Sequence, residues 1–186
     1  VAVAGHQGDE PAARHGLGDN SGDVRATALG ALARMNHLTV ADIASGLADP
    51  SPVVRRRACE LSVGMNVDIT TALADDDPLV VEAACFALGE GGPDANRRDR
   101  TISALNAVAT SHDDPLCREA AIAALGAAGV RHGLAAILAG LNDKPAVRRR
   151  AVIALAAFEG PDVDEALARA RTDRDWQVRQ AAEDLS

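Results

Sequence analysis

Aromatic residues are almost absent from this chain of 186 residues, which contains two Phe, one Trp and no Tyr. Its hydrophobic content of 47% therefore depends mainly on Ala, Leu and Val. Small and medium apolar side chains suit closely packed helices, whereas the strands of sandwiches and barrels are enriched in aromatic residues. The composition favours an all-helical protein.

Cysteines, long apolar runs and net positive charge are also lacking. Three scattered cysteines are too few for a disulfide framework, and they favour a reducing, cytoplasmic location. No apolar run approaches the roughly 18 residues of a membrane span, and the first ten residues do not resemble a secretory leader. A net charge of −8 disfavours nucleic acid and anionic membranes as partners, unless basic residues cluster locally.

What the sequence does contain is a repeat. Each copy has a valine-like anchor, usually followed by Arg, with Ala four positions after the anchor and often Leu eight after it. The anchors are Val24, Val54, Val80, Cys117, Val147 and Val178, at intervals of 30, 26, 37, 30 and 31 residues. Steps of four residues place the anchor, Ala and Leu on one stripe of a helix.

A second recurring spacing lies just before the anchor helices. Asp precedes the anchor by five residues at Asp19, Asp49, Asp75 and Asp173, and Pro precedes it by two at Pro52, Pro78, Pro115 and Pro145. Asp accepts hydrogen bonds from free amides at turns and helix starts, and Pro is tolerated in a first helical turn. Apolar stretches such as "GLAAILAGLND" predict a further helix before each of these turns.

Each unit is therefore predicted to be a helix, a tight turn and a second helix. The predicted units span approximately residues 9–36, 37–65, 66–91, 99–128, 129–158 and 161–186. One such unit cannot bury its apolar face alone, but stacked units can. We expect a single repeat domain over residues 1–186.

The segments "DPSPVVRRRA", "DDPLVVEAACFALGE" and "NDKPAVRRRAVIAL" resemble HEAT repeats, and more narrowly the short bacterial HEAT-like units also found in phycobilin lyase subunits. The resemblance covers about residues 9–186 and implies an all-α fold, a right-handed α-solenoid of about six HEAT-like helical hairpins. It implies no single activity, because the family includes scaffolds, chromophore lyases and DNA-alkylation-repair enzymes. Two features depart from the pattern: the period is shorter than the usual 40 or so, and Val81 replaces Arg in the third unit.

The family pattern also implies a role for the Arg that follows each anchor. It should reach the Asp of the preceding turn, in its own or the adjoining repeat, and so form a ladder along the stack. Arg25, Arg55, Arg118, Arg148 and Arg179 hold this position, while Asp113 and Asp143 lie one residue later than the other acids. We expect these arginines to brace the fold rather than to bind a ligand.

The residues two, three and six positions after each anchor should project outward from the second helix, which lines the concave face in HEAT-like solenoids. The predicted partner-binding residues are Arg56, Arg57, Glu82, Phe86, Glu119, Arg149, Arg150 and Ile153. They form two basic patches, a central acidic pair and an apolar strip that includes Ala123. A mixed-charge surface with an apolar centre is typical of a protein or peptide site, although an ordinary solvated helix face is the alternative.

No pattern of catalytic residues is present. Cysteines and histidines lack metal-ligand spacing, and neither a phosphate-binding loop nor a nucleophile elbow occurs. We therefore predict no enzyme activity, no catalytic residue, no metal and no cofactor. Cys59, Cys85 and Cys117 occupy core-like positions, and His112 replaces the turn Asp.

Two further segments allow a structural and a functional interpretation. Trp176 replaces the usual Pro, and we expect it to form a hydrophobic cap on the last helix. The segment "NRRDR", Asn96–Arg100, is expected in a long loop between repeats, either as a tolerated insertion or as a functional loop.

The leading hypothesis is a non-enzymatic scaffold that binds another protein or peptide through its concave face. The second hypothesis is a nucleic-acid-binding protein, either a DNA repair enzyme or its accessory. The third is a phycobilin-lyase-like subunit that acts with a partner chain. No membrane partner is expected.

Overall fold

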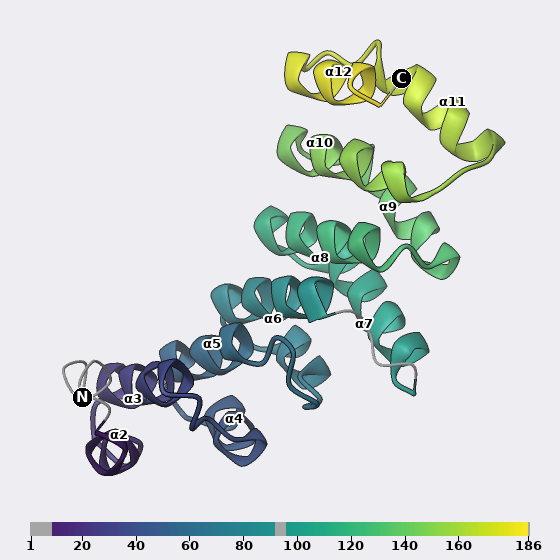
Figure 1. Ribbon diagram of the computed structural model, residues 1–186. Helices are drawn as coiled ribbons and strands as arrows, with labels where there is room; N and C mark the ends of the chain where they lie inside the picture. Colours follow the sequence, from purple (N-terminus) through teal and green to yellow (C-terminus); the bar gives the residue numbers. More distant parts are fainter. Residues whose placement is uncertain (1–8, 92–95, 186) are drawn as a thin grey trace. The chain divides into compact units, whose positions relative to one another are not determined.

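The computed structural model describes residues 9–91 and 96–185. Every regular element in these two ranges is helical, and they contain no strand. The all-α prediction is confirmed, and the helices form an α-solenoid of helical hairpins (Figure 1).

The helices come in pairs, and the second member of each pair carries the anchor. The pairs are α2 (Glu10–Gly16) with α3 (Gly22–Arg34), α4 (Val40–Leu47) with α5 (Pro52–Leu61), the 3₁₀ helix η1 (Thr70–Ala74) with α6 (Pro78–Gly91), α7 (Arg98–Ser111) with α8 (Pro115–Ala128), α9 (Leu134–Gly140) with α10 (Pro145–Ala154), and α11 (Pro161–Ala170) with α12 (Trp176–Glu183). Two short 3₁₀ segments flank the fifth pair, η2 (Arg131–Gly133) and η3 (Leu155–Ala157). The third pair differs from the others because its first helix is a single 3₁₀ segment.

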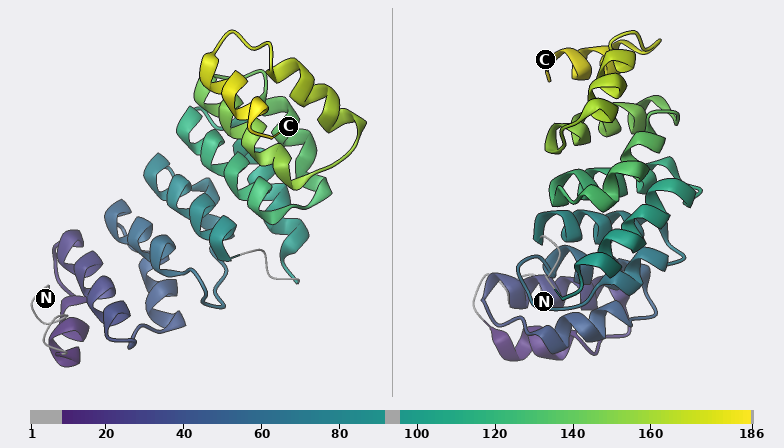
Figure 2. Two further views of the ribbon diagram at one scale, coloured as in Figure 1. Left: turned by 45° about the horizontal axis from the view of Figure 1, so that its top comes forward. Right: turned by 90° about the vertical axis from the view of Figure 1, so that its right-hand side faces the viewer.

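The chain divides into two compact units, residues 1–87 and 88–186. In the first unit α3 packs against both α2 and α5, and α5 packs against α4. In the second unit α8 packs between α7 and α10, and α10 packs against α12. There the second helices α8, α10 and α12 form one layer and the first helices α7, α9 and α11 form the other (Figure 2).

The anchor stripe forms the core, as the repeat predicts. Five of the six anchors are buried, whereas Val24 is half-buried, and the alanine four positions after each anchor is fully buried in every pair. These alanines leave room for neighbouring helices to approach closely. At Gly126 on α8 a Cβ atom would lie only 2.7 Å from the Cβ of Ala154 on α10, so this crossing requires glycine.

In five of the six turns before a second helix, a side chain accepts a hydrogen bond from the backbone amide two residues ahead, whereas Asp143 before α10 accepts from the amide of the next residue, Lys144. The Asp19 carboxylate accepts from the Ser21 amide at 2.8 Å, and the other three aspartates of this position do the same. His112 takes over the task, since its Nδ1 lies 3.0 Å from the amide nitrogen of Asp114. The predicted turn role of His112 is confirmed.

The "NRRDR" prediction is wrong in part. Helix α7 begins at Arg98, so Arg98 and Arg100 belong to its first turn and not to a loop. Arg97 is the N-cap residue, and its carbonyl accepts the Thr101 amide at 2.9 Å, which starts the helix. Residues 92–95 of the expected loop lie outside the described residues.

Candidate protein-binding surface

Four of the five arginines that follow an anchor make the same set of contacts, whereas Arg179 in the last pair donates to the Asp173 and Arg174 carbonyl oxygens of its own turn. Arg25 on α3 donates from Nε and Nη2 to the Asp49 carboxylate, at 2.8 and 2.6 Å, and from Nη1 to the Asp19 carbonyl oxygen at 2.8 Å. The equivalent bidentate pairs are Arg55 with Asp75, Arg118 with Asp143, and Arg148 with Asp173, all with distances of 2.6 to 2.9 Å. Each of these four arginines therefore ties one turn to the next.

The ladder has a definite direction. Of the two partners that the sequence left open, the carboxylate belongs to the adjoining repeat, on the C-terminal side, while the arginine's own turn offers only backbone carbonyl oxygens. Hydrogen bonds from the arginines hold the pKa values of Asp49, Asp75, Asp143 and Asp173 below their usual range. These guanidinium groups are fully engaged, so they brace the fold rather than offer a ligand site.

The outward arginines of the first unit are also paired, but on the surface. Arg56 and Arg57 both contact the carboxylate of Glu60, at 3.3 and 2.9 Å. The Arg57 guanidinium lies across Gly30 of α3, where a Cβ atom would come within 2.7 Å of it. Together with Arg34 these residues line a shallow groove between α3 and α5.

The second unit places its outward charges differently. Arg150 on α10 contacts the Glu119 carboxylate of α8 at 3.3 Å, so this basic residue and this acidic residue neutralise each other. Arg149 is exposed and makes no ion pair with any described residue. It lines a groove between α10 and α12, together with Ile153 and Trp176.

The eight predicted binding residues fall into two sets of four. Arg56, Arg57, Glu82 and Phe86 lie in the first unit, and Glu119, Arg149, Arg150 and Ile153 lie in the second. Phe86 is 59% exposed and Ile153 is exposed, whereas both glutamates are half-buried. An apolar strip that continues from one set to the other stays a prediction.

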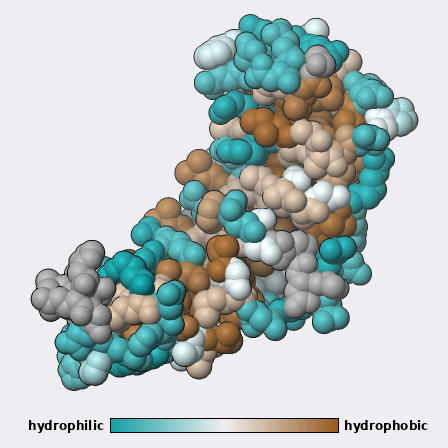
Figure 3. Space-filling model, in the orientation of Figure 1, coloured by the Kyte–Doolittle hydropathy of each residue, from teal (hydrophilic) through white to brown (hydrophobic). Residues whose placement is uncertain are grey.

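Exposed apolar side chains gather on the second helices. Of eight large apolar residues that are exposed in the described ranges, two are Val40 and Val63, and the other six lie on second helices: Val53, Leu79, Phe86, Leu116, Ile153 and Trp176. We call the exposed side of the second helices, taken separately in each unit, the second-helix surface; each unit contributes three of the six residues. Apolar surface is also visible between hydrophilic regions over the helices of the second unit in Figure 3.

Sequence reasoning missed four of these six residues. Val53, Leu79 and Leu116 directly precede their anchors, and this position lies on the same helical face as the third and sixth positions after the anchor, at steps of four and three. The signal was therefore present in the repeat.

The predicted hydrophobic cap at Trp176 is wrong. The residue is 64% exposed, and the N-cap of α12 is Asp175, whose carboxylate accepts the Gln177 amide hydrogen bond at 2.9 Å. A polar cap of this kind satisfies the free amides of a helix start without any apolar contact. Trp176 is therefore not needed to cap α12.

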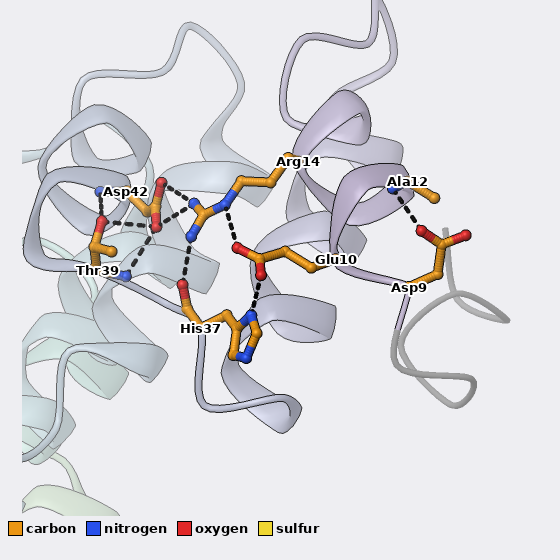
Figure 4. A network of polar contacts seen from close by, with 7 residues as sticks. All are labelled: Asp9, Glu10, Ala12, Arg14, His37, Thr39 and Asp42. Carbon is orange, nitrogen blue, oxygen red and sulfur yellow. Dashed lines mark hydrogen bonds and ion pairs between the residues drawn. The ribbon is translucent and has the colours of Figure 1, made fainter.

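A polar network joins α2 to the start of α4 at the other end of the chain (Figure 4). Arg14 donates to both carboxylate oxygens of Asp42, at 2.8 and 2.7 Å, and to Glu10 at 3.2 Å, while His37 contacts the other oxygen of Glu10. Hydrogen bonds from His37 and Arg14 lower the pKa of Glu10. Asn36, with φ of 58°, turns the chain at the end of α3 and so aims His37 at α2. Each of these side chains has a partner within the network, which connects α2 to the start of α4.

The cysteines lie in the core of the fold. All three cysteines are buried and outside any disulfide of the described residues, and burial raises the pKa of the Cys59 thiol to about 12. No group of three His, Cys, Asp or Glu side chains with metal-binding geometry occurs among the residues that the structure describes. A search of the same residues for a helix long and apolar enough to cross a membrane finds none.

Comparison with known proteins supports the repeat. Residues 102–185 match the HEAT repeats family. The structure of human deoxyhypusine hydroxylase in complex with glycerol is similar over 100% of this chain and 78% of its own, with a TM-score of 0.54 and 18% identity. An engineered protein is similar over 98% of this chain and 81% of its own, with a TM-score of 0.52 and 20% identity. No curated protein sequence matches the chain. At these identities the likeness to solved structures shows the fold alone.

Proposed function

Since the chain is a HEAT-like repeat protein, we propose that it is a non-enzymatic binding module, which docks another protein on its second-helix surface. One observation carries this proposal: six of the eight exposed large apolar residues of the described ranges lie on second helices. Apolar and aromatic side chains grouped on a polar surface are typical of protein interfaces. A cytoplasmic location, where free thiols persist, forms part of the proposal.

The charges near this surface support a protein partner over nucleic acid. Three of its four predicted arginines already contact a neighbouring carboxylate, Glu60 or Glu119. A net charge of −8 adds a repulsive term toward phosphate groups. Neither a bilin-binding role nor the chemistry of a hydroxylase gains support from any described side chain, and the likeness to the human hydroxylase is one of fold.

The test is affinity capture from native lysate, with and without nuclease. The double variant Arg56→Glu/Arg149→Glu places a reversed charge on the second-helix surface of each unit. Its control, Arg169→Glu/Arg174→Glu, makes the same change of net charge at exposed sites of α11 and the following turn. Circular dichroism should show equal helix content in all three proteins.

We expect discrete protein partners that survive nuclease, are lost with the first double variant and are retained by the second. Loss of a few central side chains commonly weakens an interface tenfold or more. Partners that the first double variant retains would contradict the second-helix surface as the docking site. Captured nucleic acid, released by nuclease or by salt, would favour the alternative function.

A further inference from the structure

The groove between α10 and α12 has a distinct chemistry. It has a volume of about 330 Å³, and its lining includes Arg149, Ile153, Trp176, Gln180, Asp184 and Leu185. This size suits one or two side chains of a bound segment rather than a large cofactor. An aromatic ring, an aliphatic side chain and a guanidinium group thus border one concave site within a single compact unit.

Trp176 carries the first part of the inference. The other second helices from α5 to α10 have Pro two residues before the anchor, where α12 has Trp176. Because the Asp175 carboxylate caps α12, the helix needs no help from the indole ring. Keeping so large an apolar ring 64% exposed is unfavourable for the isolated chain, and the exposure is relieved if a partner covers it.

Arg149 carries the second part. It is the middle member of a run of three arginines whose outer members are both occupied: Arg148 is buried against Asp173, and Arg150 contacts Glu119. Arg149 makes no ion pair with the described residues and borders the groove. A guanidinium group that is free beside an apolar ring is well suited to bind a carboxylate in a fork geometry.

The groove also has a negative charge, Asp184, so its lining contains both a basic and an acidic residue. Asp184 lies at the C-terminal end of α12, where its carboxylate accepts a hydrogen bond from the side-chain Nε2 of Gln180 at 2.9 Å. Trp176 and Asp184 are eight residues apart, which corresponds to about 12 Å along a helix. An extended segment of four residues covers a similar length, about 13 Å.

We propose that this groove binds a short segment of a partner protein, in which an acidic side chain pairs with Arg149 and an adjacent bulky apolar side chain covers Trp176 and Ile153. The apolar lining and the free cation together fit such a segment, and Asp184 favours a basic residue at its far end. The inference rests on the proposed function and names the chemistry of the partner at one site.

Trp176 also provides the assay, because the chain has one Trp and no Tyr. Its emission reports directly on the groove and should shift to shorter wavelength when the ring leaves water. The probe is the blocked pentapeptide acetyl-Asp-Leu-Phe-Ser-Lys-amide, titrated to about 5 mM because a segment of this size binds weakly. The matched probe replaces its Asp with Asn.

We expect a saturable shift with the acidic peptide and an affinity about tenfold lower for the Asn peptide or for the Arg149→Glu variant. Arg169→Glu, an equal change of charge on α11 outside the groove, should bind the acidic peptide as the unaltered chain does. No shift with the acidic peptide, or equal affinity for both peptides, would overturn the inference.

Other occupants give distinguishable results. A shift that appears on raising the protein concentration without peptide would assign the groove to a second copy of the chain, and a salt-sensitive shift with a DNA duplex would assign it to nucleic acid; either result overturns the peptide assignment. Failure of the peptide while lysate partners are still captured would leave the proposed function standing and remove only this site. Peptide binding without any captured partner would support the groove as a binding site and count against the proposed function in the cell.

Discussion

Removing the Arg148 side chain should destabilise the second unit by about 3 kcal/mol. The substitution Arg148→Ala deletes three hydrogen bonds: two to the Asp173 carboxylate, at 2.9 and 2.8 Å, and one to the Asp143 carbonyl oxygen, at 2.8 Å. It also leaves the Asp173 carboxylate without its cation. The ladder interpretation depends on this contact being strong.

The expected size follows from burial. The side chains of Arg148 and Asp173 are only 6% and 16% exposed. Breaking a buried ion pair by removing one partner typically costs about 3–5 kcal/mol. Asp173 keeps some contact with water and keeps the Asp175 amide hydrogen bond, so the lower end of this range applies.

Arg131 offers a control with the same chemistry and a different exposure. It donates to both Asp162 oxygens, at 3.1 and 2.9 Å, and to the Glu159 carbonyl oxygen at 2.7 Å. These side chains are 61% and 40% exposed. Exposed ion pairs contribute about 0–1 kcal/mol to stability. Arg131→Ala should therefore lower the free energy of unfolding by about 2 kcal/mol less than Arg148→Ala does.

The assay is urea unfolding at pH 7, followed by circular dichroism and by the emission of Trp176, which lies on the neighbouring helix α12. A double-mutant cycle with Asp173→Ala isolates the coupling between the two side chains and should give more than about 1.5 kcal/mol. If Arg148→Ala proves no more destabilising than Arg131→Ala, burial does not make this contact strong. The bracing role of the ladder would then be refuted.

Three further predictions concern stability and reactivity. The ladder aspartates have lowered pKa values, so the stability they contribute is complete above the unfolded pKa of about 4 and is lost as pH falls below it. The free energy of unfolding, measured in urea at several acidic pH values, should show this loss, and the loss should be smaller in Asp173→Asn. The three buried cysteines, including Cys59 with a pKa of about 12, should react with a thiol reagent only after unfolding, and prompt reaction of the native chain would contradict their burial. Gly126→Ala should cost about 2 kcal/mol in urea unfolding because its Cβ meets Ala154 at 2.7 Å, whereas Gly18→Ala, with its nearest contact at 3.7 Å, should cost less than half as much.

The sequence predicts the fold well because each feature that builds it recurs at a fixed register. Anchor, alanine and turn residue repeat six times with few exceptions, and each repetition tests the interpretation of the others. The direction of the ladder is harder to predict from the sequence. Asp49 is six residues before Arg55 and 24 after Arg25, so spacing alone favours the nearer arginine, yet the carboxylate pairs with Arg25. Packing of adjacent hairpins decides this choice.

Helix boundaries and caps limited the rest of the prediction. Arg98 and Arg100 look like part of a polar insertion because they follow "GGPDAN", but α7 already includes them. Trp176 appears apolar and terminal in sequence, which suggests a buried cap, whereas Asp175 beside it satisfies the free amides of α12. In both cases a short-range polar contact determines the structure, and hydrophobic pattern does not report it.

The run Arg148, Arg149 and Arg150 shows why function is harder to read than fold. Successive residues of a helix are rotated by about 100°, so three identical side chains enter three environments: a buried ladder, an open groove and a contact with Glu119. The first environment recurs in four pairs and is predictable from the repeat. The groove depends on Trp176, which occurs once, so no period marks it. A binding site that distinguishes one repeat from the others must break the pattern by which the fold is recognised.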